Sequence, residues 1–246
     1  MPASRRPPNR RDHHRRRGPG DLTSPVTLPA ADEHQEPATM TPMRQIPRAT
    51  VARLAHYLQG LDQLDDRTVS SHAIAAVVGV GAAQVRRDLS YLGHQGVRGV
   101  GYDAEHLRSA IMRELGLVGT VGVAIVGAGN LGQALAGYRG FVERGFTVFS
   151  LYDIDPAKVG QHVGGLPIRH LDDMAIDASA GHFAIAIIAT PADAAPEVLA
   201  RLNQAGIRSI LNFAPAVLRP PESIEVRNVD LSTELQILSF YRKHGR

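Results

Sequence analysis

The stretch VGVAIVGAGNLGQALAGYRGF, residues 121–141, decides the fold of the second half of this chain. An apolar run breaks at Gly127, Gly129 and Gly132, and apolar residues then return at helical spacing. A GxGxxG pattern alone is a weak signal, because three glycines recur by chance. Here the pattern follows an apolar strand and opens a helix, and Asp153 ends the next predicted strand. This context predicts a site for a dinucleotide.

Each part of the motif has a predicted task in holding the dinucleotide. Gly127 permits a tight turn, Gly129 lets the backbone approach the pyrophosphate, and Gly132 lets the helix pack closely on the strand. The N-terminus of the helix supplies N–H donors and a positive dipole. Asp153 would accept a hydrogen bond from a ribose hydroxyl and repel a 2′-phosphate. The predicted cofactor is therefore NAD(H) rather than NADP(H).

Strands and helices alternate through residues 117–230, which predicts an α/β domain with a Rossmann-like, doubly wound parallel sheet and right-handed crossovers. The dinucleotide should lie over the carboxyl ends of the strands. Thr190 and Asn212 lie just beyond two predicted strands and are expected to contribute further contacts. The predicted cofactor-binding residues of this domain are Gly127, Ala128, Gly129, Asn130, Leu131, Gly132, Asp153, Thr190 and Asn212.

Residues 44–116 carry the pattern of a winged helix-turn-helix domain. A first helix begins at Pro47, a second helix ends at the turn formed by residues 79–81, and a third runs over about residues 82–92. Three short helices with a tight turn before the third match a helix-turn-helix core. The segment GHQGVRGVGY, residues 93–102, has alternating valines between glycines and predicts a short hairpin, the wing.

The third predicted helix separates an aliphatic face from a polar one. Val85, Leu89 and Leu92 share the first face, and cationic and hydrogen-bonding side chains occupy the rest. A solvated amphipathic helix would show the same pattern, but the basic wing that follows favours DNA binding. Arginine can reach guanine or phosphate in a major groove, glutamine can pair with adenine, and Arg98 of the wing can enter a minor groove. The predicted DNA-binding residues are Gln84, Arg86, Arg87, Ser90, Tyr91 and Arg98.

Composition excludes several other classes of protein. The chain has 246 residues, 43% of them hydrophobic, which is enough to bury a core in two domains. No apolar run is long enough to span a membrane, and no secretory signal follows the Arg-rich start, so we expect a cytoplasmic protein. Cysteine is absent and the histidines lack ligand spacing, so no metal site is predicted. Residues 1–43 show no periodicity and are expected to form a disordered arm.

Seven motifs follow one another between about Ile46 and Tyr241. They are RATVARLAHYL, SSHAIAAVVGVGAAQVRRDLSYLG, RGVGYD, VGAGNLGQALAGYRGF, YDIDPAKVG, ILNFAPAVL and NVDLSTELQILSF. In this order they resemble the motifs of the Rex redox-sensing transcriptional repressors. The resemblance implies a homodimer that binds a pseudo-palindromic operator in double-stranded DNA with NAD⁺ or without a ligand, and releases it when NADH accumulates.

The resemblance also assigns roles to residues that the patterns alone leave open. It implies that a helix within residues 231–246 is domain-swapped between subunits, that Tyr102 approaches the nicotinamide, and that Asp230 belongs to an inter-subunit polar network. The family pattern has an arginine near the end of the first helix as partner of that aspartate, whereas this chain has Gln59. A neutral amide forms no charge-assisted pair. The interdomain latch is therefore expected to be weaker, unless another arginine, such as Arg53, turns toward Asp230.

Two other functions fit parts of the sequence. An NAD-dependent oxidoreductase with an accessory winged-helix domain would need a positioned acid or base and a second substrate pocket. The four histidines of the second half form no recognisable constellation, so no catalytic residue is predicted. A CoA- or adenine-nucleotide-binding module is the other alternative, because related Rossmann domains hold CoA.

Overall fold

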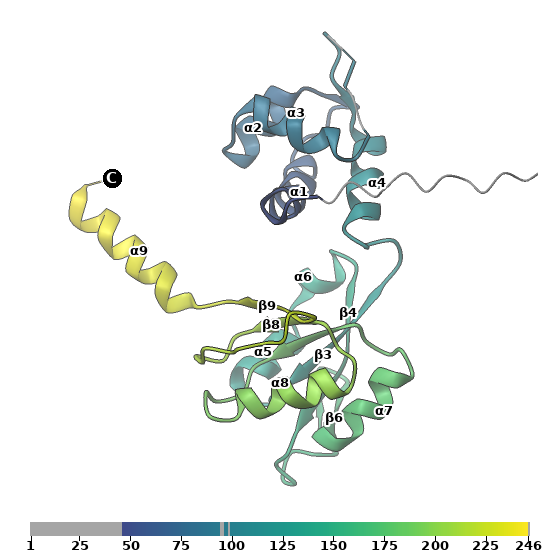
Figure 1. Ribbon diagram of the computed structural model, residues 1–246, viewed down its shortest axis with the longest axis vertical. Coiled ribbons are helices and arrows are strands. Elements are labelled where there is room, and N and C mark those ends of the chain that lie inside the picture. The colour runs from purple at the N-terminus through teal and green to yellow at the C-terminus, as the bar shows by residue number, and fades with distance from the viewer. Residues whose placement is uncertain (1–45, 94–95, 98, 246) are drawn as a thin grey trace, which may run out of the picture. The chain divides into compact units, whose positions relative to one another are not determined.

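The computed structural model describes residues 46–93, 96, 97 and 99–245. They form a helical part, a seven-stranded sheet covered by helices, and a C-terminal helix (Figure 1). The predicted arm, residues 1–43, lies outside the described residues. The fold is therefore α/β, with a helical N-terminal region followed by a Rossmann-like parallel sheet, as the sequence predicts.

The helical part packs four helices and a two-stranded antiparallel sheet around one apolar core. Its elements are α1 (Arg48–Leu61), β1 (Thr68–Val69), α2 (Ser71–Val78), α3 (Ala82–Ser90), β2 (Tyr102–Asp103) and α4 (Ala104–Glu114). Ser70 caps α2 by accepting a hydrogen bond from the backbone N–H of Ala73, and Gly79 ends the helix with a φ of 75°. An isolated antiparallel bridge joins Val97 to Gly101, within the segment that predicts the wing.

The sheet has the strand order β5-β6-β4-β3-β7-β8-β9, and all of its pairs are parallel except β5 with β6. Its strands are β3 (Val121–Val126), β4 (Phe146–Asp153), β5 (His162–Val163), β6 (Leu166–His170), β7 (Ile185–Ile188), β8 (Ser209–Asn212) and β9 (Glu225–Asn228). The chain leaves β3 toward β4 on one side and later returns to β7 on the other. A ligand-binding crevice is expected at this change of direction.

Helices cover both faces of the sheet (Figure 1). Successive residues of β3 point to opposite faces, so Ala124 and Val126 pack in one core with α7 (Met174–Ser179) and α8 (Ala195–Gln204). Val123 and Ile125 pack in a second core, which includes Leu135 of α5 (Asn130–Ala136) and Phe141 of α6 (Arg139–Val142). A 3₁₀ turn, η1 (Leu171–Asp173), precedes α7. The doubly wound arrangement is thus present.

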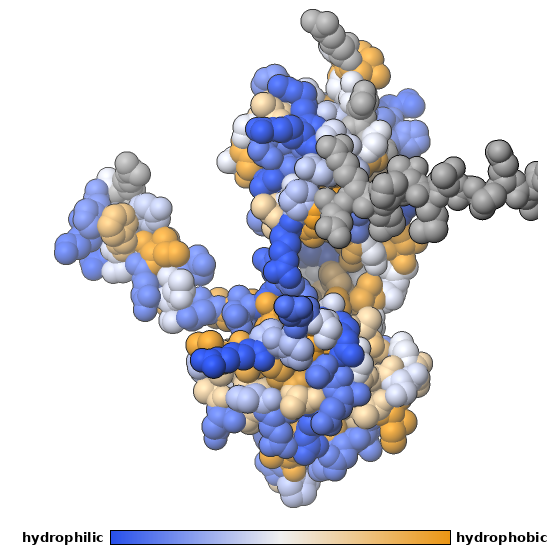
Figure 2. Space-filling view, in the orientation of Figure 1, coloured by the Kyte–Doolittle hydropathy of each residue, from blue (hydrophilic) through white to orange (hydrophobic). Residues whose placement is uncertain are grey.

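The last helix, α9 (Leu231–His244), has no buried residue. Its large apolar side chains are all exposed, and the face of the helix seen in Figure 2 shows part of this apolar surface in orange among hydrophilic residues. They are Leu231, Leu235, Ile237, Leu238, Phe240 and Tyr241. At 100° per residue they occupy one broad side of the helix, on which Glu234 and Arg242 also lie, and Ser232, Gln236, Ser239 and Lys243 lie opposite. The structure therefore shows an amphipathic C-terminal helix but no exchange between subunits.

Two further findings bear on the predicted absences. Within the described ranges, none of the helices is both long and apolar enough to cross a bilayer. In the same part of the chain, no three histidine, aspartate or glutamate side chains gather as a metal site would require.

The packing of α5 on β3 requires glycine at position 132. An ideal Cβ at that position would lie 1.9 Å from the carbonyl oxygen of Gly127, a backbone atom that cannot turn aside. Gly127 has a φ of 105°, and its Cβ would lie 2.6 Å from the carbonyl oxygen of Ala189. The two glycines therefore allow helix, turn and strand to meet at a distance that no side chain permits.

Gly132→Ala is expected to lower the free energy of unfolding by about 1–3 kcal/mol, the usual cost of overpacking. This loss would outweigh the roughly 1 kcal/mol of helix propensity that alanine gains. Urea denaturation followed by circular dichroism measures the change. Gly129→Ala is the matched control, because no atom lies within 4 Å of its Cβ position and its φ is −81°. Equal losses in the two variants would contradict this explanation.

Candidate dinucleotide cleft and nucleic-acid interface

A cleft of about 450 Å³ opens at the carboxyl ends of β3, β4 and β7. Gly127 and Gly129 line it from the turn after β3, and Asp153 lines it from the end of β4. Thr190 follows β7 on its other side. Four of the predicted cofactor-binding residues therefore meet in one cleft, at the position where the topology predicts a ligand.

The remaining predicted residues of the motif lie around this cleft rather than on its wall. Ala128 and Gly132 are buried, and Asn130 and Leu131 form the exposed first turn of α5. The backbone N–H of Ala128 donates to Oδ2 of Asp153 at 2.8 Å, so this donor is used within the protein. Their contacts with a cofactor stay predictions.

Asp153 is held by three donors. Its Oδ1 accepts from the backbone N–H of Asp155 at 2.9 Å, and its Oδ2 accepts from Ala128 and from Nζ of Lys158 at 3.0 Å. Burial works against the charged carboxylate, but these hydrogen bonds outweigh it and hold the pKa of Asp153 below its usual value. An ionised carboxylate accepts hydrogen bonds and donates none, which suits a ribose hydroxyl.

Lys158 is a cleft residue that the sequence reasoning missed. Besides its bond to Asp153, its Nζ lies 3.8 Å from a carboxylate oxygen of Asp155. The available signal was its place in YDIDPAKVG, five residues beyond Asp153. It is the cation nearest to the predicted ribose contact.

Thr190 carries an unpaired polar atom at the wall of the cleft. Its Oγ1 is buried and has no hydrogen-bond partner within the described chain. Buried polar atoms are nearly always paired, and an exception calls for an explanation. A hydroxyl or amide group of a bound ligand would supply the missing partner, so the residues present fit a nucleotide here.

Asn212 and Tyr102 do not line this cleft. Asn212 is buried, its Nδ2 donates to Oδ1 of Asn228 at 2.9 Å and to the carbonyl oxygen of Ala214 at 3.2 Å, and its Oδ1 accepts from Ala214. Tyr102 packs in the core of the helical part, where burial raises its pKa, and its ring lies against Gly96. Both have a structural explanation, and their roles toward a cofactor stay predictions.

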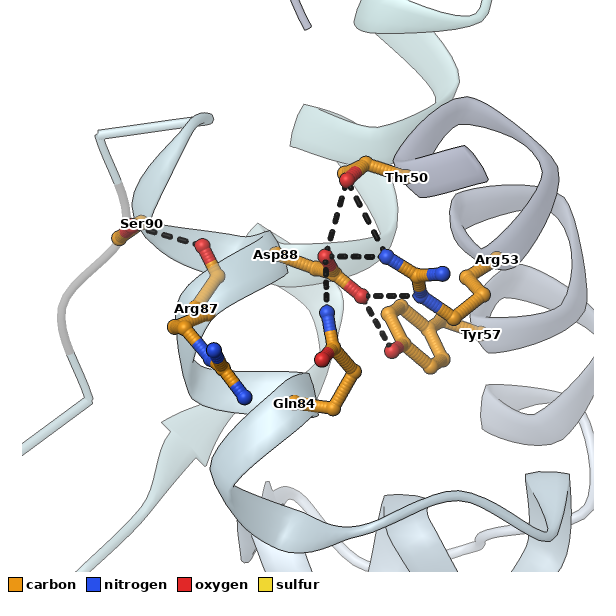
Figure 3. A network of polar contacts seen from close by, with 7 residues as sticks. All are labelled: Thr50, Arg53, Tyr57, Gln84, Arg87, Asp88 and Ser90. Atoms are coloured by element: carbon orange, nitrogen blue, oxygen red, sulfur yellow. Dashed lines mark hydrogen bonds and ion pairs between the residues drawn. The ribbon is translucent and has the colours of Figure 1, made fainter. Parts of the chain in front are cut away.

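The polar side chains of α3 differ in how free they are. Arg87 is exposed and lies on the side of the helix away from α1 (Figure 3). Nη1 of Arg86 donates to Oγ of Ser71 at 3.0 Å, and Oγ of Ser90 donates to the carbonyl oxygen of Arg87 at 2.7 Å. Tyr91 follows the helix and is half-buried. Arg98 lies outside the described residues.

Asp88, on the buried side of α3, is the centre of a polar network (Figure 3). From α1 it accepts hydrogen bonds from Oγ1 of Thr50 at 3.0 Å and the hydroxyl of Tyr57 at 2.7 Å. Nε and Nη2 of Arg53 donate to its two oxygens at 2.6 and 2.9 Å. Nε2 of Gln84 adds a bond of 3.0 Å from α3 itself. Burial by itself would raise the pKa of Asp88, but these hydrogen bonds outweigh burial and lower the pKa to about 2.

This network gives Arg53 a partner within the chain, because its guanidinium is paired with Asp88 through two nitrogens. A contact of Arg53 with Asp230 stays a prediction. Asp230 caps α9, where it accepts from the backbone N–H and hydroxyl of Ser232 and from the hydroxyl of Thr233. Gln59 is exposed on α1. A latch between Gln59 and Asp230 stays a prediction.

Comparisons with known proteins match both halves of the chain. Residues 120–216 match the family described as "CoA binding domain", and residues 45–90 match the family described as "Putative DNA-binding protein N-terminus". The redox-sensing transcriptional repressor Rex of Streptomyces avermitilis is 52% identical over 221 residues, which cover 88% of this chain and 87% of that protein.

Two crystal structures of RSP, a Rex-family repressor, resemble this fold closely. The complex with beta-NAD⁺ and operator DNA has a TM-score of 0.75 and 34% identity, and covers 82% of this chain and 94% of that one. The complex with beta-NADH has a TM-score of 0.71 and 33% identity, and covers 81% of this chain and 95% of that one.

Proposed function

We propose that this chain, which belongs to the Rex family of redox-sensing transcriptional repressors, binds operator DNA with NAD⁺ or without a ligand and releases it when NADH binds. Family membership makes it a repressor rather than an enzyme. The observation that carries the proposal is the presence of two binding surfaces in one chain, the exposed side of α3 and the cleft over β3, β4 and β7. RSP, a relative by sequence and fold, is known with operator DNA and with both nucleotides.

The proposed ligand is a nicotinamide dinucleotide whose adenosine ribose contacts Asp153. Oδ1 of Asp153 accepts one hydrogen bond within the protein and keeps capacity for a second, from a ribose hydroxyl. Three other carboxylates, those of Asp155, Asp193 and Glu197, line the same cleft and add repulsion against a 2′-phosphate. Thr190 would donate or accept at its unpaired hydroxyl.

Discrimination between the two redox forms is proposed to rest on desolvation. NAD⁺ carries a positive charge on the nicotinamide ring and NADH does not. An apolar pocket, with Tyr102 as one wall, makes the cationic ring costly to bury and admits the neutral ring. The two effects are linked: the factor by which bound NADH lowers the affinity for operator equals the factor by which bound operator lowers the affinity for NADH.

The proposed assembly is a homodimer in which α9 is exchanged between subunits. The broad apolar side of α9 is uncovered in the single chain, and we assign a second copy of the chain as its occupant. A dimer presents two α3 helices to half-sites about 34 Å apart, which explains a pseudo-palindromic operator. NADH then acts by favouring an arrangement in which that spacing is lost.

The proposed location is the cytoplasm, and the segment after α3 is proposed to act as a wing.

One titration tests the function as a whole. Protein is held on a palindromic duplex selected from a random pool, and the ratio of NADH to NAD⁺ is varied at constant total nucleotide. The proposal requires release as the ratio rises. Retention at every ratio would overturn it. Loss of absorbance at the nicotinamide band on addition of a second substrate would instead support an oxidoreductase.

The match of residues 120–216 to the CoA-binding family supports a second ligand. Competition between CoA and NADH for the purified chain separates the two. NADH should bind more tightly than CoA. The adenosine ribose of CoA carries a 3′-phosphate, and the carboxylate of Asp153 would repel that phosphate at the proposed ribose contact.

The DNA surface yields the first prediction of this proposal. Arg87→Ala should weaken operator binding by roughly 5- to 150-fold, since losing a base or phosphate contact costs about 1–3 kcal/mol. Fluorescence anisotropy with a labelled duplex measures it. The affinity for NADH should not change. Arg219→Ala removes the same charge from an exposed loop of the sheet domain and should leave operator affinity intact. Equal affinity for operator in wild type and Arg87→Ala would remove Arg87 from the interface.

The ribose contact yields the second prediction. Asp153→Ala should weaken NADH binding by roughly 10- to 100-fold, because a hydrogen bond to a charged group contributes about 1.5–3 kcal/mol. It should also narrow the preference for NADH over NADPH, since the repelling charge is lost. Calorimetric titration of both nucleotides gives the two affinities. Asp193→Ala removes a charge from the same cleft without touching the predicted ribose site and should preserve most of the preference. An unchanged preference in Asp153→Ala would refute this role.

The apolar side of α9 yields the third prediction. Leu238→Asp should weaken dimerisation at least about a hundredfold, because a carboxylate would be buried without a partner. Sedimentation velocity over a concentration series measures it. Ser239→Asp places the same charge on the polar side of the helix and should leave the dimer intact. A wild-type chain that sediments as a monomer, or equal effects of the two variants, would exclude this assignment of α9.

A further inference from the structure

Gln84 does not stand free on α3, although its side chain was predicted to read a base. Its Nε2 donates to Oδ1 of Asp88 at 3.0 Å (Figure 3). Asp88 lies one turn further along the same helix and is only 1% exposed. Gln84 itself is half-buried, so its amide contacts the buried Asp88 on one side and remains accessible from the surface on the other.

Asp88 is itself fixed by α1. Thr50, Arg53 and Tyr57 lie along one face of α1, and all three donate to the carboxylate. Arg53 contacts both oxygens, a bidentate geometry that leaves the carboxylate little freedom to turn. The plane of the Asp88 carboxylate is therefore set by the packing of α3 on α1.

The chemistry of the carboxylate decides which end of the Gln84 amide faces it. A carboxylate whose pKa is about 2 is ionised at neutral pH and accepts hydrogen bonds only. The amide must turn its nitrogen toward Asp88 and its Oε1 away. The nitrogen carries two hydrogens and spends one on Asp88. One N–H and Oε1 remain, side by side, and these are the donor and acceptor that pair with N7 and N6 of adenine.

We propose that Asp88 is a positioning residue that orients Gln84 to read an adenine in the major groove. The inference rests on the proposed DNA binding. Asp88 touches no base, since its two oxygens receive five donors from the protein. It acts through Gln84, and it makes the orientation of the Gln84 amide depend on how α3 packs against α1.

The test measures base preference rather than overall affinity. A preferred palindromic duplex is selected with the wild-type chain and NAD⁺, and every symmetric single-base substitution of it is then compared by competition. The wild-type chain should prefer A·T at one position of each half-site. In Gln84→Ala that preference should fall by roughly 5- to 100-fold, and preferences at the other positions should persist.

Asp88→Asn should reduce the same preference, because the asparagine no longer dictates which end of the Gln84 amide it receives. In a Gln84→Ala background, Asp88→Asn should change nothing at that position. Arg53→Lys is the second variant, for the case that Asp88→Asn does not fold. It keeps the charge but not the bidentate contact, and should lower the same preference in part. Arg219→Ala, which removes an exposed arginine of the sheet domain without a link to Asp88, should leave it intact.

The outcomes separate this inference from the function it rests on. A wild-type chain that enriches no duplex overturns DNA binding and this inference together. If the wild type binds but Gln84→Ala keeps every base preference, Gln84 is only a structural partner of Asp88. Full preference in both Asp88→Asn and Arg53→Lys, with loss in Gln84→Ala, shows that Gln84 reads the base without help from Asp88. The last two results each overturn this inference alone.

Discussion

The close contact of α5 with β3 is the constraint on which the nucleotide half of the molecule depends. The helix can approach the strand only because residues 127 and 132 carry no side chain. The resulting turn places the N–H of Ala128 against Asp153, and the N–H of Gly127 donates to the carbonyl oxygen of Tyr152 at 2.8 Å. The turn after β3 is thereby fastened to the end of β4. The backbone packing, the orientation of the Asp153 carboxylate and the opening of the cleft all follow from this close contact between α5 and β3.

Asp88 and Asp153 are both ionised carboxylates that hydrogen bonds stabilise against burial, but they differ in how much capacity they keep for a ligand. Each is a carboxylate taken largely out of water, a change that favours the neutral form. In each case donors from the protein outweigh that effect, and the group stays ionised. Oδ2 of Asp153 accepts from two donors and Oδ1 accepts from one, so Oδ1 keeps capacity for a further donor. Asp88 is saturated, so it can act on a ligand only through a neighbour such as Gln84.

Local patterns allowed much of this to be predicted. The GxGxxG turn and the alternation of strands and helices depend on residues close in sequence, and both are present in the structure. β5 and β9 carry no recognisable strand pattern in the sequence. β5 has only two residues, and β9, with the sequence EVRN at the edge of the sheet, shows no apolar run.

Contacts between elements could not be predicted in the same way. Three of the residues that donate to Asp88 come from α1, more than thirty residues earlier in the chain, so no spacing reveals them. The pairing of Arg53 with Asp88 likewise joins two helices that are distant in sequence. Lys158 was overlooked for the opposite reason. It lies close to Asp153 in sequence, but a lysine in a surface loop carries no distinctive pattern.

The groups around the cleft are suited to holding a nucleotide and not to moving protons. The polar side chains of its described lining are carboxylates, one lysine, a threonine and Tyr152, and no histidine lines it. Three of the four histidines of the second half make contacts elsewhere. His170 caps η1, His182 stacks on Phe149, and His244 lies against Phe240 on α9. A group such as Asp153, whose pKa is lowered, stays charged through the neutral range and exchanges no proton with a ligand. A cleft of this kind responds to its ligand through shape and charge rather than through proton transfer.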